Sequence, residues 1–138
     1  MTDSDKTPSR VLQPASWPRP RGYANGIVGS GETIFLAGQI GWDAQGRFAD
    51  GLSGQVGQAL SNIVTLLAEA GAEPRHMFRL TWFVTDLRAY RDGQAAIGAE
   101  YRRVIGRYFP TMSVIGVSEL VEPAAVVEIE ATAVLPRT

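Results

Sequence analysis

The stretch that decides the fold reads FPTMSVIGV over residues 109–117, and VEIEATA follows it over residues 127–133. Pro110 cannot continue a helix, so any helical pattern before it must have ended. Strand-forming residues dominate both segments, and alternate side chains of a strand face opposite sides of a sheet. Pro123, in the connection between them, indicates a turn. We therefore expect two strands, at about residues 112–118 and 125–135.

Two amphipathic helices are expected before these strands. The first covers about residues 52–70 and is ended by Gly71 in a left-handed cap. Its apolar residues fall on one stripe at helical spacing: Val56, Leu60, Ile63, Val64 and Leu67. The second covers about residues 93–107 and turns another apolar set inward: Ile97, Tyr101, Val104 and Ile105. Its arginines point outward: Arg102, Arg103 and Arg107.

Three further strands complete the expected sheet. Residues 27–28 and 33–37 resemble a hairpin around a Gly-Ser-Gly-Glu turn, and residues 77–85 alternate with period two. The order β-β-α-β-α-β-β favours an α+β fold, a mixed sheet with two helices on one face. Trp42, Phe83 and other apolar residues are left for the opposite face. We expect an oligomer to bury that face.

Composition limits the possible functions. The 138 residues suit one domain, with a flexible leader over residues 1–20 and a folded domain over 21–138. A net charge of −1 gives no general attraction for nucleic acid or an anionic membrane. There is no cysteine, and the single His76 reads as a surface or strand-entry residue, so we expect no metal site. Without a secretion signal or an apolar span, the expected location is the cytoplasm.

Five short motifs, in order, resemble the RidA (YjgF) family of enamine/imine deaminases. They span about residues 22–135: GYANG at 22–26, AGQI at 37–40, FVTDL at 83–87, Phe109-Pro110, and VEIEA at 127–131. The resemblance implies a chorismate-mutase-like fold and a homotrimer whose sheets form a central barrel. It also implies a small-molecule pocket between each pair of adjacent subunits, with neither metal nor cofactor.

The resemblance also implies site residues. Glu128 matches the family glutamate that handles the attacking water, and Tyr23 and Gly38 match residues that line the substrate pocket. Met112 and Ser113 fall at the pocket strand, and Trp42 is a loop candidate for the same pocket. Glu130 shares a face with Glu128, about 7 Å along the strand, so it is either coupled to Glu128 or part of a polar network between subunits.

Two departures from the family pattern bear on the substrate. Met112 stands where the family has its catalytic arginine, and Gly98 stands where many of its deaminases have asparagine. A charge-assisted hydrogen bond contributes roughly 1.5–3 kcal/mol, so Met112 cannot hold a carboxylate as arginine does. Either another arginine reaches the pocket, or the substrate is more apolar and contacts Met112, Trp42 and Trp82. The candidate arginines are Arg19, Arg21, Arg88 and Arg91.

The leading function is hydrolytic deamination, or a related hydrolysis, of an enamine, imine or other carbonyl-derived metabolite. A non-catalytic metabolite-binding or regulatory trimer is the alternative. Some relatives carry an endoribonuclease label. Three arginines on one wet helix face, Arg102, Arg103 and Arg107, with no aromatic platform, are more typical of solubility than of RNA recognition. We therefore do not expect nucleic acid as a partner.

Overall fold

A computed structural model describes residues 9–137 of the chain. Its main sheet has four strands in the order β3-β6-β4-β5. Only the β4–β5 pair is parallel. These strands are β3 (Glu32–Ile40), β4 (Met77–Val84), β5 (Thr111–Gly116) and β6 (Val127–Leu135). A mixed sheet with helices packed on it is the α+β architecture expected from the sequence.

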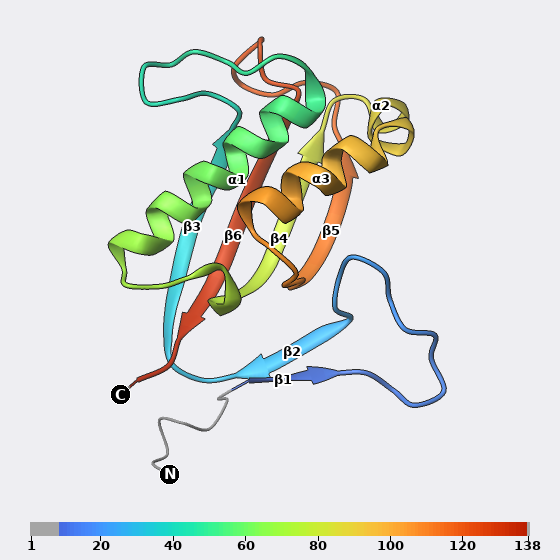
Figure 1. The fold of residues 1–138 in the computed structure, drawn as a ribbon, viewed down its shortest axis with the longest axis vertical. Coiled ribbons are helices and arrows are strands. Elements are labelled where there is room, and N and C mark those ends of the chain that lie inside the picture. Colours follow the sequence, from blue (N-terminus) through green and yellow to red (C-terminus); the bar gives the residue numbers. More distant parts are fainter. Residues whose placement is uncertain (1–8, 138) are drawn as a thin grey trace.

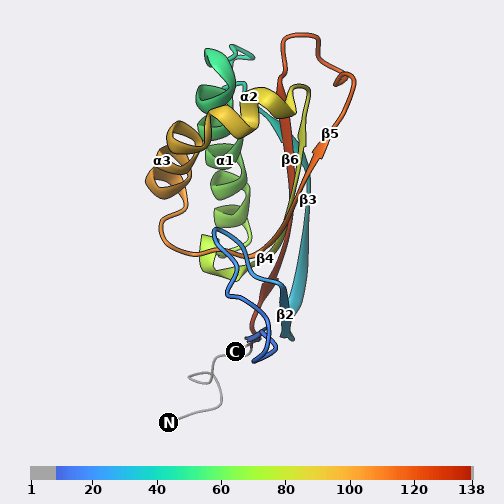
Figure 2. The same cartoon turned by 90° about the vertical axis from the view of Figure 1, so that its right-hand side faces the viewer.

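Both long helices cover the same face of the sheet (Figure 2). They are α1 (Gly51–Glu69), which crosses β3 and β6, and α3 (Gln94–Val104), which lies toward β4 and β5 (Figure 1). The short helix α2 (Leu87–Asp92) precedes α3, and the 3-10 turn η2 (Pro74–His76) precedes β4. No helix among residues 9–137 is long and apolar enough to span a bilayer.

The core lies between the helices and the sheet. Four of the five stripe residues expected for α1 are fully buried: Val56, Leu60, Ile63 and Leu67. From β6, Val127, Ile129 and Ala133 face them, so the odd-numbered positions of this strand point inward. Gly71 has φ 74° and ends the helix in the left-handed conformation that the sequence predicts. Helical and strand periodicity therefore locate the core correctly.

The expected hairpin is wrong. β2 (Gly26–Gly29) pairs with β1 (Ser9–Leu12), while β3 pairs antiparallel with β6. Ile34 and Leu36 of β3 pack against the core, so this strand is stabilised by joining the main sheet rather than by pairing with its neighbour in sequence. The turn at Gly31 has φ 150° and passes against the backbone of Leu135 at the end of β6. Only glycine fits there.

The flexible leader expected over residues 1–20 contains β1, so residues 9–12 are part of a strand pair; residues 1–8 lie outside the described range. Asn25 and Gln13 are joined by a side-chain hydrogen bond of 3.0 Å, which ties the segment after β1 to the start of β2. The second expected helix, at about residues 93–107, corresponds to α3, which ends at Val104, whereas α2 before it was not expected. The Asp86 carboxylate caps α2 by accepting from Ala89 N–H.

His76 does not lie at the surface. It is 6% exposed, and its Nδ1 accepts a hydrogen bond of 2.9 Å from the backbone N–H of Glu73. Burial, with a smaller contribution from the charge of Arg75, lowers the pKa of this imidazole. The buried His76 therefore holds the turn that enters β4.

The sheet face opposite the helices, called the open face below, carries apolar groups without cover. Phe35 on β3 is 79% exposed, and Ile115 on β5 is also exposed. Phe83 on β4 faces the same way, in register with Glu128 of β6. Large apolar side chains are normally covered in a stable assembly.

Candidate active site

A cavity of about 300 Å³ lies under α3, on the helix-covered side of the sheet. We call it the helix-face cavity. This volume is at the lower end of small-molecule pockets, which run from about 300 to 1,000 Å³. The residues that line it belong to β4 and β5, to α2 and α3, and to the segments before β2 and after α3: Gly22, Trp82, Tyr90, Gln94, Ile97, Gly98, Tyr101, Arg102, Phe109 and Met112.

Aromatic rings fix the walls of this cavity. Tyr101 and Phe109 are stacked with centroids 5.3 Å apart, and Trp82 meets Tyr90 edge to face at 6.2 Å. The Tyr101 hydroxyl donates to the Tyr108 carbonyl at 2.6 Å, and burial raises the pKa of Tyr101. This phenol stays neutral and its proton is engaged, so it is a wall residue and not a base.

The cavity joins Met112 and Trp82, two of the three residues that the sequence offered for a more apolar pocket; the third, Trp42, does not line it. Trp82 is 3% exposed and belongs to the core as well. Its indole Nε1 is buried and has no hydrogen-bond partner within residues 9–137. A buried donor without a partner is uncommon and requires an explanation.

A second, smaller hollow of about 180 Å³ lies around Tyr23. It brings together three of the predicted substrate-binding residues, Tyr23, Met112 and Ser113. The Tyr23 segment is held there because Ala24 donates its N–H to the Pro110 carbonyl at 3.0 Å and bridges to Thr111. Arg79 of β4 also lines this hollow, although the sequence analysis did not count it as a site residue. Arg79 pairs in register with Thr111, and this pairing becomes visible only in the structure.

Gly38 and Glu128 form a third element of the site. A Cβ atom at Gly38 would lie 2.6 Å from Cδ and 2.7 Å from Cγ of Glu128, so the glutamate side chain lies directly on the glycine backbone. A β-bulge between Leu36 and Gln39 shapes β3 at this point. The sequence predicts both residues for the site, and the fold places them in contact.

These elements lie at opposite sides of the sheet. Gly38 is on the edge strand β3 and Met112 on the edge strand β5, with β6 and β4 between them. Three strand spacings of about 4.8 Å separate the edge strands by roughly 14 Å. Within one chain, Glu128 and Gly38 therefore do not line either hollow around Met112.

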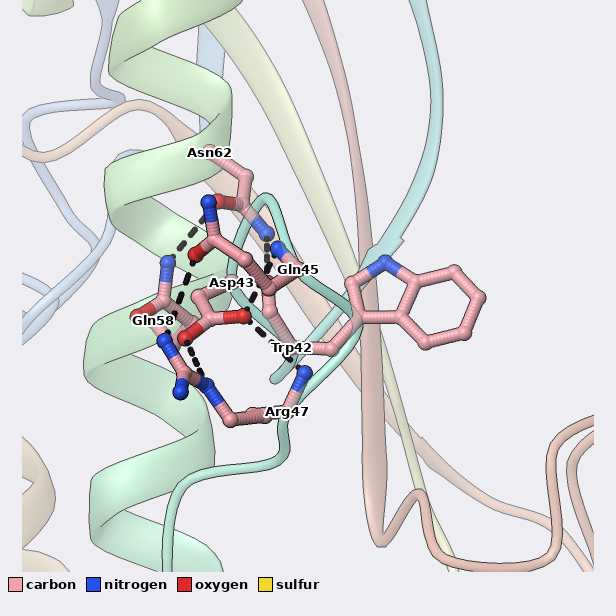
Figure 3. A network of polar contacts seen from close by, with 6 residues as sticks. All are labelled: Trp42, Asp43, Gln45, Arg47, Gln58 and Asn62. Atoms are coloured by element: carbon pink, nitrogen blue, oxygen red, sulfur yellow. Dashed lines mark hydrogen bonds and ion pairs between the residues drawn. The ribbon is translucent and has the colours of Figure 1, made fainter.

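Trp42 lines neither of the two hollows around Met112. Its loop is held to α1 by Asn62, whose amide donates to the Trp42 carbonyl at 2.9 Å (Figure 3). The same amide donates to the Ile40 carbonyl at 3.1 Å. Asp43 closes the same loop by accepting from the backbone of Gln45 and Arg47. The Trp42 ring points away from this polar network and lies 5.6 Å from Phe48.

The four arginines that the sequence offered as substitutes for the missing one do not line the helix-face cavity; Arg102 does. Arg102 is exposed, as expected for the outward face of its helix, and it lines the cavity as well. Its Nη1 would lie 3.3 Å from a Cβ atom at Gly98, one helical turn earlier, so the guanidinium lies over that glycine. The i, i+4 spacing of Gly98 and Arg102 was the overlooked signal. No cluster of three or more potential metal ligands occurs within residues 9–137.

Comparison with known proteins finds relatives along nearly the whole chain. The sequence model of the endoribonuclease L-PSP family matches residues 16–135. A RutC family protein of Synechocystis is 32% identical, covering 92% of this chain and 97% of its own length. A 2-iminobutanoate/2-iminopropanoate deaminase of Dermatophagoides farinae is 27% identical, covering 94% of this chain and 98% of its own length.

A solved structure supports the same relationship. The Rid family protein YyfB of Yersinia pestis superposes with a TM-score of 0.82 at 35% identity, covering 94% of this chain and all of that one. Sequence and fold therefore agree over nearly the whole length. The chain belongs to the RidA (YjgF) family, whose sequence model is named for endoribonuclease L-PSP.

Proposed function

We propose that three copies of the chain form a ring and hydrolyse an enamine, imine or other small carbonyl-derived metabolite at pockets between subunits. The observation that carries this proposal is the Glu128 carboxylate, which lies against the Gly38 backbone near one edge of the sheet. The Met112 hollows lie at the other edge. The deaminase name of one relative supports the reaction type.

A cyclic assembly would join the two halves. If the β3 edge of one chain faces the β5 edge of the next, Gly38 and Glu128 approach the Met112 hollows of the neighbour. Head-to-tail contacts of this kind close into rings when the rotation per subunit divides a full turn. The exposed Phe35 and Ile115 on the open face supply apolar surface for such a contact.

The chemistry assigned to Glu128 is the handling of water. Its carboxylate accepts a proton as the water oxygen bonds to the imine carbon and returns a proton to the nitrogen. The C–N bond then breaks, ammonia leaves, and loss of the hydroxyl proton gives the carbonyl product. An enamine first takes a proton at carbon to reach the imine. Met112 provides no charge for a substrate carboxylate, so a small anionic imine held by a strand arginine is not the expected substrate.

The test is turnover of imines generated in situ from a panel of amino acids by an amino acid oxidase. We expect Glu128→Gln to lower the rate of imine loss by about 10²-fold, because it keeps size and hydrogen bonding but removes the base. Glu69→Gln, an exposed carboxylate at the end of α1 and outside both hollows around Met112, is the matched control and should retain the rate. Dissociation of the assembly by Glu128→Gln would instead make Glu128 a structural residue.

A non-catalytic metabolite-binding ring is the second candidate. The replacement of the family arginine by Met112 favours it, since the pocket keeps its shape without the charged clamp. Saturable binding of small metabolites, together with an absence of turnover over the whole panel in both the wild type and Glu128→Gln, would select this candidate.

A further inference from the structure

Both departures from the family pattern line one cavity. Met112 and Gly98 face the helix-face cavity together with Arg102. We propose that this cavity binds a monocarboxylate with an aromatic or branched apolar body, and that Arg102 of α3 is its cationic anchor. The proposal rests on the proposed function for the role of the cavity as the substrate pocket, and it adds the ligand class and the anchoring residue.

The position of Arg102 depends on Gly98. Its Nη1 lies in the space next to the position of a Cβ atom at residue 98, at 3.3 Å. A larger side chain there, such as asparagine, would compete with the guanidinium for that space. The Arg102 guanidinium can therefore occupy this place because residue 98 is glycine.

The charge of Arg102 is available for a ligand. Within residues 9–137, Arg102 makes no ion pair, whereas its neighbour Arg103 is paired with Glu100 at 2.6 Å. A guanidinium binds a carboxylate through two parallel hydrogen bonds, which adds geometric selectivity to the charge. An anion that enters beside α3 would therefore meet a cation that is not already paired.

The remaining walls select the body of the ligand. Ile97, Met112 and the stacked pair Tyr101 and Phe109 give apolar surface on which a ring or a branched chain packs. A small polar anion would leave these walls uncovered, so an apolar body is required.

Calorimetric titration of the full chain with three probes tests the assignment: phenylacetate, phenylacetamide and acetate. We expect phenylacetate to bind at least about tenfold more tightly than the other two, because phenylacetamide lacks the negative charge and acetate lacks the phenyl group. Arg102→Gln should weaken phenylacetate by about tenfold, and so should Gly98→Asn, which fills the space of the guanidinium. Arg107→Gln, an exposed arginine outside the cavity, should leave the affinity unchanged.

Equal affinities for phenylacetate and phenylacetamide would overturn the proposal. So would an equal loss in Arg102→Gln and Arg107→Gln, or an absence of phenylacetate binding up to millimolar concentration. Arg102-dependent binding without imine turnover would contradict only the proposed function. Turnover that depends on Glu128 but is unaffected by Arg102→Gln for every imine would contradict only the Arg102 assignment.

Discussion

At the scale of single residues, contact between Gly38 and Glu128 shows how a site can depend on an absent side chain. Because a Cβ atom at Gly38 would overlap the Glu128 side chain, any other residue there would push the carboxylate from its place. Gly98 has the same relation to Arg102, with a looser fit. Glu128 and Arg102, the two charged residues proposed to act in the site, thus each lie against a glycine. The amino-acid composition does not show these two contacts.

His76 gives a prediction about pH. Its pKa is lowered in the folded chain, so the unfolded chain binds a proton more readily. The stability that neutral His76 contributes is therefore full above the unfolded pKa of about 6.5 and is lost as pH falls through the lower folded value. Protonated Nδ1 also cannot accept from Glu73 N–H.

His76→Asn keeps an acceptor but does not titrate. We expect the free energy of unfolding of the wild type, measured by urea titration, to fall relative to this variant as pH is lowered from about 7 to about 5. The comparison removes the effect of carboxylates that titrate in both proteins. A constant difference across this range would show that His76 does not link folding to protonation.

At the scale of elements, the spacing of apolar residues predicted which side of a helix or strand is buried in the core. Four of the five stripe residues on α1 are buried, as their spacing predicted. The spacing in β6 predicted that Glu128 and Glu130 share a face, and the residues of the opposite face are the buried ones. The pairing of β2 could not be read in this way, because a short strand fits several partners and its true partner, β1, lies in a segment rich in proline. The Met112 position was readable from motif order. The position of the Arg102 guanidinium depends on the open space at Gly98. The i, i+4 spacing of these two residues places them on the same side of the helix but does not determine where the guanidinium lies.

The central role of α1 predicts the largest cost of truncation in the core. Leu60 is fully buried between α1 and the sheet, so Leu60→Ala should lower the free energy of unfolding by about 2–5 kcal/mol. Leu66, exposed on the same helix, is the matched control, and Leu66→Ala should change it by only about 0.5 kcal/mol. Chemical denaturation at one protein concentration measures both. Similar losses in the two variants would mean that the outer side of α1 is also covered in the assembly.

At the scale of the whole molecule, the four-stranded sheet within residues 9–137 ends in the edge strands β3 and β5 and leaves one face uncovered. The residues proposed for catalysis and for ligand anchoring lie near different edges, so a single chain does not complete a pocket containing both. The same geometry links assembly to activity. Loss of the ring should therefore remove turnover even when every chain remains folded.

The uncovered open face predicts the oligomeric state. We expect sedimentation equilibrium at micromolar concentration to give three times the chain mass of 14.9 kDa. Phe35 is 79% exposed in the single chain, so burial at the centre of the proposed trimer would remove its phenyl group from water. Phe35→Lys should then dissociate the assembly, because an unpaired ammonium cannot be buried at low cost. Val121→Lys, at a loop position that is 95% exposed, should keep the assembled mass. A wild-type chain that sediments as a monomer would contradict both the ring and the pocket between subunits.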